Sequence, residues 1–293
     1  MKRTLFLILC IHIIVGCKND KTISQQTTNK ELDSLPIDTT TYQNTSLKKE
    51  STINSEQLLL LFSQKRKLVS EKLKNISKNE ANELYESYFK SNELILEKLI
   101  QTEVSILDKF YNEDTETKNL IKRKEKELLT HGLEFNEMGE GLVEIKTKNE
   151  FYYNIFKNYV TDDYRDYLEI KKNEGNTSYS NDGGLVISFR ELGDRIIVWE
   201  KFMEKYPNSK LIPSVKQNYK DYQWDYIFGM ENTRTIEDTN PKNLFIYPEN
   251  IEEFNRFKKM YPSSATNKLI NIFFEHFKDD NIHDLIENEQ RKL

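Results

Sequence analysis

An internal repeat in the last third of the chain constrains the fold more than any other sequence feature. Placing residue 199 over residue 254, an offset of 55 positions, aligns two segments without a gap. Each contains a Tyr-Pro-x-Ser turn, at residues 206–209 and 261–264. Proline ends a helix because it lacks an N–H donor, and serine favours the start of the next one. Each unit is therefore predicted to be an αα-hairpin. The aligned core pairs are Trp199 with Phe254, Phe202 with Phe257, Val215 with Ile270, Tyr219 with Phe274, and Tyr222 with Phe277.

We expect these hairpins at about residues 188–229 and 248–279. The capping box Ser188-x-x-Glu191 begins the first, and Gly229 is suited to end it. The stretch between the hairpins is expected to interrupt regular stacking.

The first third of the folded chain, residues 55–132, also has apolar residues at helical spacing. A capping box at Ser77-x-x-Glu80 begins the second of three expected helices, and Gly132 suits the end of the third. We expect an antiparallel bundle here. The chain has only 9 Gly and 6 Pro, which disfavours a turn-rich sheet protein.

The region from 133 to 293 is predicted to be helical and to contain the two hairpins. Its one β element is expected near residues 142–145, after the Gly139-Glu140-Gly141 turn. Further short helices are expected at 151–159 and 161–173. The fold class is therefore mainly α: an antiparallel helical bundle followed by αα-hairpin repeats.

The amino terminus has a different character. Lys2 and Arg3 precede the apolar run 5–15, and small Gly16 follows it. A basic start, a short apolar run and a small residue are typical of a secretory signal peptide, here residues 1–16. The run is shorter than the roughly 20 apolar residues that span a bilayer.

The segment Ile14-Val15-Gly16-Cys17 resembles the lipobox of bacterial lipoproteins. This resemblance implies cleavage between Gly16 and Cys17 and a diacylglycerol thioether on the Cys17 sulfur. It thus implies a membrane anchor made of acyl chains such as palmitate. The next residue is Lys18 rather than aspartate. By the same resemblance, this favours the outer membrane of the cell envelope and leaves the periplasmic face and the cell surface both open.

Residues 17–54 are predicted to be a disordered tether that begins at the lipidated cysteine. The segment is rich in Thr, Ser, Asn, Gln and Lys, and its apolar residues follow no period. The chain has two cysteines, and Cys10 would leave with the signal peptide. Loss of Lys2 and Arg3 would change the formal net charge from −5 to −7.

The hairpin pattern Phe-x-x-x-Tyr-Pro-x-Ser resembles the helix ends of tetratricopeptide-like periplasmic proteins, including the outer-membrane assembly lipoprotein family. The resemblance covers residues 196–224 and 251–278. The period differs from the family's spacing of about 34 residues. Val, Tyr, Ile and Phe occupy the positions where such repeats nest on Ala and Gly.

A search for chemistry finds no catalytic, cofactor-binding or metal-binding motif. The chain has no His-Glu-x-x-His, Gly-x-Ser-x-Gly, Walker or Gly-x-Gly-x-x-Gly sequence. If His276 and His283 shared one helix with Asp279 and Asp280, the two histidines would lie about 10.5 Å apart along its axis. That separation rarely allows both to bind one metal. The net negative charge also disfavours nucleic acid as a partner.

Aromatic residues, 12% of the chain, are the most suggestive functional feature. Trp224, Tyr226 and Phe228 are candidate partner-binding residues because Trp and Tyr are enriched at interfaces. Periodicity also allows Tyr226 to belong to the helix core together with Tyr219 and Tyr222. Trp224 lies off that stripe, so it faces either a neighbouring helix or a ligand.

These observations lead to three functional hypotheses. The first is a lipid-anchored, non-enzymatic envelope protein whose helical domain binds a partner protein. The second is an inhibitor or immunity lipoprotein against an envelope toxin or hydrolase, since an acidic tethered domain suits occlusion of a basic enzyme. The third is a hydrolase that uses an unrecognised carboxylate pair.

The anchor can be tested by replacing its nucleophile. A Cys17→Ser variant should take up no acyl label and keep its signal peptide, because the thiol is the lipid attachment atom. The matched variant Cys10→Ser should be labelled and processed like the natural chain. Normal processing and membrane anchoring of the Cys17→Ser protein would contradict the lipobox interpretation.

Overall fold

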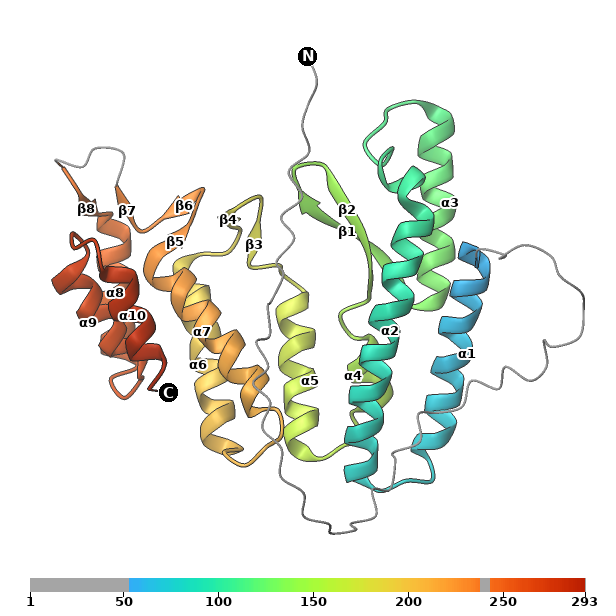
Figure 1. Ribbon diagram of the computed structural model, residues 1–293, viewed down its shortest axis with the longest axis horizontal. Helices are drawn as coiled ribbons and strands as arrows, with labels where there is room; N and C mark the ends of the chain where they lie inside the picture. Colours follow the sequence, from blue (N-terminus) through green and yellow to red (C-terminus); the bar gives the residue numbers. More distant parts are fainter. Residues whose placement is uncertain (1–52, 238–242, 293) are drawn as a thin grey trace, which may run out of the picture. The chain divides into compact units, whose positions relative to one another are not determined.

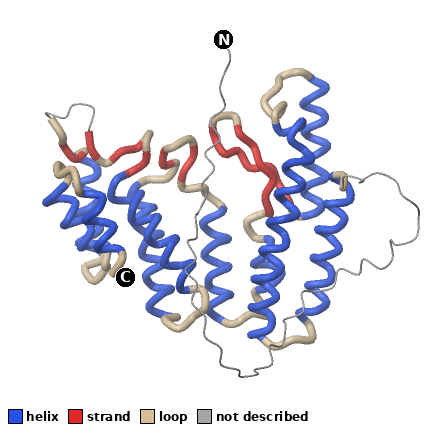
Figure 2. The backbone as a smooth tube through the Cα atoms, viewed as in Figure 1, coloured by secondary structure: helices blue, strands red, loops and turns tan. Residues whose placement is uncertain are grey.

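The structure, a computed structural model, describes residues 53–237 and 243–292. This part of the chain has periodic apolar residues and forms ten helices and eight short strands (Figures 1 and 2). The predicted fold class, mainly α with short β elements, is confirmed. The helices are α1 (Ser55–Leu73), α2 (Lys78–Leu107), α3 (Thr115–His131), α4 (Phe151–Phe156), α5 (Asp162–Gly175), α6 (Phe189–Lys205), α7 (Ile212–Phe228), α8 (Pro248–Met260), α9 (Thr266–His276) and α10 (Ile282–Gln290). The strands are β1 (Leu133–Gly139), β2 (Leu142–Thr147), β3 (Ser180–Asn181), β4 (Gly184–Leu185), β5 (Gly229–Met230), β6 (Thr233–Arg234), β7 (Ile236–Glu237) and β8 (Phe245–Ile246).

The first three helices run alternately up and down, as the sequence predicted (Figure 1). The capping box at Ser77 is formed, and Gly132 ends α3 in the left-handed conformation, with φ of 80°. Helix α1 packs on α2, and a buried ion pair joins Lys124 of α3 to Glu103 of α2 at 2.8 Å.

The predicted strand near 142–145 is present, but it pairs with a strand that the sequence analysis missed. β1 and β2 form an antiparallel hairpin in which Phe135 lies opposite Ile145. The Phe135 ring packs 5.2 Å from the ring of Phe110, so the apolar face of the hairpin contacts the end of the helical bundle.

The pairs α6–α7 and α8–α9 are the two predicted αα-hairpins, and their turns have nearly the same geometry. Tyr206 and Tyr261 both have φ of −129°, with ψ of 56° and 61°. The hydroxyl oxygens of Ser209 and Ser264 each accept a backbone N–H from two residues further on, at 3.2 Å. The predicted capping box at Ser188 is also formed.

Three other parts differ from expectation. Helix α10 was not predicted because residues 282–290 have only Ile282, Leu285 and Ile286 as apolar residues. The segment between the hairpins, expected only to interrupt regular stacking, contributes strands β5 to β8. The aromatic helix expected at 151–159 ends at Phe156.

Four two-stranded ribbons lie at the same end of the helices (Figure 2). A Cβ on Gly139, in the β1–β2 turn, would lie 2.9 Å from the backbone nitrogen of Asp182, so this turn touches the β3–β4 turn. The N–H of Asn232, in the β5–β6 turn, donates to the carbonyl oxygen of Gly183 at 2.9 Å. The first three ribbons therefore contact one another in sequence order.

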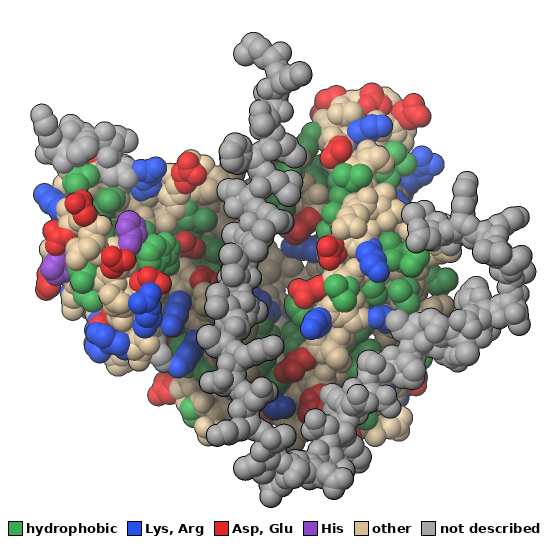
Figure 3. Space-filling view, in the orientation of Figure 1, with side chains coloured by type: hydrophobic (Ala, Val, Ile, Leu, Met, Phe, Trp, Pro, Cys, Tyr) green, Lys and Arg blue, Asp and Glu red, His purple; other side chains and the backbone are tan. Residues whose placement is uncertain are grey.

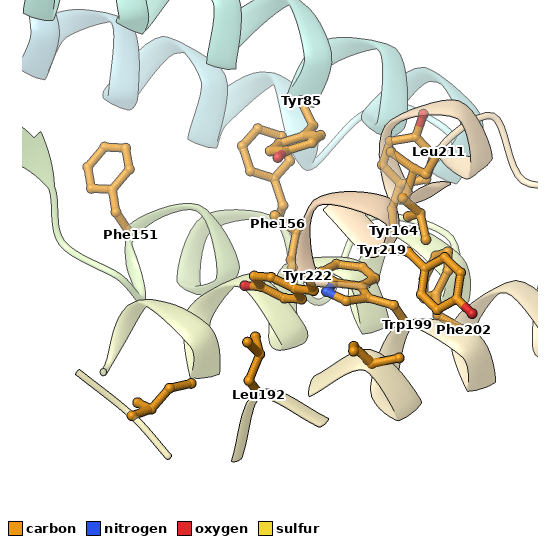
Figure 4. Packing of buried hydrophobic residues seen from close by; sticks show 14 of the residues in the cluster. Tyr85, Phe151, Phe156, Tyr164, Leu192, Trp199, Phe202, Leu211, Tyr219 and Tyr222 are labelled. Atoms are coloured by element: carbon orange, nitrogen blue, oxygen red, sulfur yellow. The ribbon is translucent and has the colours of Figure 1, made fainter. Parts of the chain in front are cut away.

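The core that joins the helices is strongly aromatic (Figure 4). Trp199, Tyr164 and Tyr219 are among its fully buried side chains. The hydroxyl groups of many tyrosines reach carboxylates on neighbouring elements. These hydrogen bonds join Tyr111 to Glu137, Tyr164 to Glu86, Tyr179 to Asp225, Tyr206 to Asp166, Tyr219 to Glu200, Tyr226 to Glu253, Tyr247 to Glu237, and Tyr261 to Asp194.

The predicted signal peptide, Gly16 and Cys17, and nearly all of the predicted tether lie outside the described residues. Within the described ranges, no helix has the length and apolar character needed to span a membrane. Residues 52–293 form one compact unit.

The contact between ribbons predicts different effects of alanine at two glycines of one turn. Gly139 and Gly141 both have positive φ, of 90° and 77°, so alanine should strain either backbone by about 1 kcal/mol. A Cβ at residue 141 would meet no atom within 4 Å, whereas one at residue 139 would overlap Asp182. In urea unfolding, Gly139→Ala should therefore lower the free energy of unfolding by about 2 kcal/mol more than Gly141→Ala. Equal losses would contradict the ribbon contact.

Candidate functional site

The end of helix α7 carries the three predicted partner-binding residues on two different faces. Tyr226 is fully buried, its ring lies 5.3 Å from that of Phe254, and its hydroxyl donates to Glu253. The interpretation of Tyr226 as partner-binding is therefore wrong, because the residue lies on the core stripe of the helix. Trp224 and Phe228 are only half-buried, and their ring centroids lie 4.6 Å apart, one helical turn from each other.

A third ring comes from helix α10. The His283 ring centroid lies 4.4 Å from that of Phe228, nearly parallel to it, and 5.4 Å from that of Trp224. Buried Ile282 anchors the start of α10, which leaves the adjacent His283 on the surface. Sequence reasoning missed this stack because His283 lies 55 residues beyond Phe228 and no local pattern joins them.

Two of these rings, Phe228 and His283, line a cavity of about 340 Å³. Helices α7, α9 and α10 and strands β5, β6 and β7 all contribute to its wall. We call the pocket and its ring stack the aromatic corner. The cavity is lined by Phe228, Gly229, Met230, Glu231, Arg234, Ile236, Phe273, Phe277, Ile282 and His283, and Trp224 stacks beside it.

Gly229 determines how the chain borders this pocket. It has φ of 73°, and a Cβ on it would lie 2.8 Å from the Cα of Arg234. The close approach lets the chain leave α7 and return as the β5–β6 ribbon, which places Glu231 and Arg234 at the mouth. The Arg234 side chain donates from Nε to the carbonyl oxygen of Glu231 at 3.2 Å.

The two carboxyl-terminal histidines do not share a helix. His276 ends α9, where its Nδ1 lies 2.7 Å from a carboxylate oxygen of Asp279, and His283 belongs to α10. Among the described residues, no group of three His, Cys, Asp or Glu side chains is placed to hold a metal ion.

A second histidine contact was not foreseen. The Ser63 hydroxyl lies 2.6 Å from Nδ1 of His131, which joins α1 to α3. In Ser–His catalysis, a third group usually orients the imidazole. No carboxylate within the described residues hydrogen-bonds the His131 ring, so the pair acts here as a link between helices.

Several inward-facing carboxylates are held by aromatic or basic donors. Trp199 donates to Glu174 at 2.8 Å, and both Tyr226 and Arg256 donate to Glu253. Burial raises the pKa of Asp225, although the hydroxyl of Tyr179 donates to it at 3.1 Å. These contacts tie elements together, and the hydrolase hypothesis stays a prediction.

Compared with known protein families, curated proteins and solved structures, the chain has no match.

The ring stack predicts a measurable role for His283. A His283→Ala variant should expose Trp224 to acrylamide, so quenching of its fluorescence should increase. The lost ring contacts should also lower the free energy of unfolding by about 1 kcal/mol. The other tryptophan, Trp199, is fully buried and should stay protected.

The matched control for this measurement is His276→Ala. Because His276 is partly exposed and pairs with the exposed carboxylates of Glu275 and Asp279, the control should change stability by less than about 0.5 kcal/mol. Equal quenching in both variants would show that His283 does not cover Trp224.

Proposed function

We propose that the protein is a lipid-anchored envelope protein whose helical part binds a partner protein at the aromatic corner. The observation that carries the proposal is the cavity of about 340 Å³, lined mostly by apolar side chains together with exposed His283, with half-buried Trp224 stacked beside it. Rigid aromatic side chains around a desolvated pocket are the usual centres of protein interfaces.

The walls of the pocket favour recognition of an apolar group. Phe273 is fully buried and Ile282 nearly so, and both are fixed by packing in the core. Phe277, also in the wall, is only half-buried. A partner side chain that enters this cavity would cover aromatic surface without first having to order it, which lowers the entropic cost of binding.

The membrane part of the proposal rests on the sequence alone. The segment ending at Gly16-Cys17 supports lipid attachment, and Lys18 supports delivery to the outer membrane. A tether of the predicted composition would let the helical part reach a partner away from the membrane surface.

A site-specific cross-linking experiment tests the partner-binding function. A photoreactive phenylalanine analogue replaces His283 in the full chain, and a control chain carries it at exposed Glu204 of α6. Irradiation of native envelopes should give a discrete adduct from position 283 and none from position 204. Adding Phe277→Ala should lower the yield of that adduct about tenfold, because an anchor pocket is worth roughly 1.4 kcal/mol or more.

Two results would contradict this function. One is the absence of any adduct from position 283 under conditions where the lipid anchor is processed. The other is an adduct whose yield does not change when Phe277 is truncated while circular dichroism shows an intact fold.

A further inference from the structure

The surroundings of the aromatic corner are rich in carboxylates without ion-pair partners. Residues 279–289 contain five Asp or Glu, of which Asp279, Glu287 and Glu289 have partners in His276, Arg291, Lys268 and Lys292. Within the described part of the chain, Asp280, Asp284 and Glu231 are exposed and form no ion pair. Asp280 and Asp284 flank the pocket residues Ile282 and His283, and Glu231 lines the mouth. In Figure 3, acidic, basic and apolar side chains lie together around the histidines of the carboxyl-terminal helices.

The neighbouring cations already have contacts within the chain. Arg234 donates to the carbonyl oxygen of Glu231, and Nζ of Lys278 lies 5.3 Å from the ring centroid of Phe277. Both cations keep their charges, but the three carboxylates Glu231, Asp280 and Asp284 outnumber them, so the local charge at the pocket is net negative. Like charges would repel an acidic segment, whereas Lys or Arg would be attracted.

We propose that the aromatic corner selects a cationic segment of its partner. One apolar or aromatic side chain of that segment occupies the cavity, and flanking Lys or Arg side chains meet Glu231, Asp280 and Asp284. This inference rests on the proposed partner-binding function and specifies the chemistry of the partner.

Three short peptides separate the apolar and the charge contributions. They are blocked at both ends and have the sequences Lys-Lys-Phe-Lys-Lys, Lys-Lys-Ala-Lys-Lys and Glu-Glu-Phe-Glu-Glu. Each is titrated into the natural chain while the fluorescence of Trp224 is followed. The Lys-flanked Phe peptide should bind at least tenfold more tightly than either of the others, a difference of about 1.4 kcal/mol. Its affinity should also fall as salt is added, because the carboxylates are exposed.

Matched charge variants test whether the carboxylates at the aromatic corner attract the Lys-flanked Phe peptide. The triple variant Glu231→Gln, Asp280→Asn and Asp284→Asn should weaken binding of the Lys-flanked Phe peptide about tenfold. A control triple variant, Glu116→Gln, Glu125→Gln and Glu204→Gln, changes the net charge equally at exposed positions elsewhere. It should bind like the natural chain. Equal weakening by both triple variants, or equal affinity for the Lys- and Glu-flanked Phe peptides, would overturn the proposal.

The cross-linking experiment distinguishes failure of this inference from failure of the function. If position 283 still captures a partner but the Lys-flanked Phe peptide does not bind, the cationic specificity is wrong and the partner-binding function stands. If position 283 captures no partner and the Lys-flanked Phe peptide does not bind, both the cationic specificity and the partner-binding function are wrong. Reversible self-association that Phe277→Ala abolishes would instead make the corner a contact between two copies and overturn the cationic proposal.

Discussion

The hydrogen bond from a tyrosine hydroxyl to a carboxylate is the interaction on which this helical structure depends. The ring buries apolar surface in the core, while the hydroxyl satisfies an acid on the neighbouring element. Tyr164 joins α5 to α2, Tyr219 joins α7 to α6, and Tyr226 joins α7 to α8 in this way. Each bond has a charged acceptor, so its contribution is about 1.5–3 kcal/mol. Burial raises the pKa of these tyrosines, so the hydroxyl proton stays available at neutral pH.

The same bond explains how a chain with large residues at its helix contacts can stack hairpins. In each Tyr-Pro-x-Ser turn, the tyrosine hydroxyl and the serine hydroxyl both donate to carboxylates of an earlier helix. Tyr206 reaches Asp166 of α5, and Tyr261 reaches Asp194 of α6. These hydrogen bonds at the turns thus hold each hairpin in position against the helix before it. In other helical repeats, close packing of small residues has this role.

Periodicity predicted the helices well because α1 to α3 and α6 to α9 each carry a long apolar stripe or a capping signal. It failed for β1, whose sequence Leu-Glu-Phe-Asn-Glu-Met-Gly contains few apolar residues, and for the short helix α10.

The site was only partly predictable. Trp224 lies off its helix stripe, which suggested an external contact, but the ring that meets it belongs to His283 on another helix. No pattern in the sequence marks which of 48 acidic residues will receive a tyrosine hydroxyl.

The ribbons at one end of the helices have a mechanical consequence. Gly139 approaches Asp182, and Gly183 accepts the N–H of Asn232, so successive turns meet through backbone atoms. The helices between them are also held by tyrosine bonds near the Tyr-Pro turns. Neighbouring helices are thus bonded near both ends, so separating them or rotating one past the other breaks at least one set of bonds. The bonds at the two ends therefore oppose hinge opening between neighbouring helix pairs.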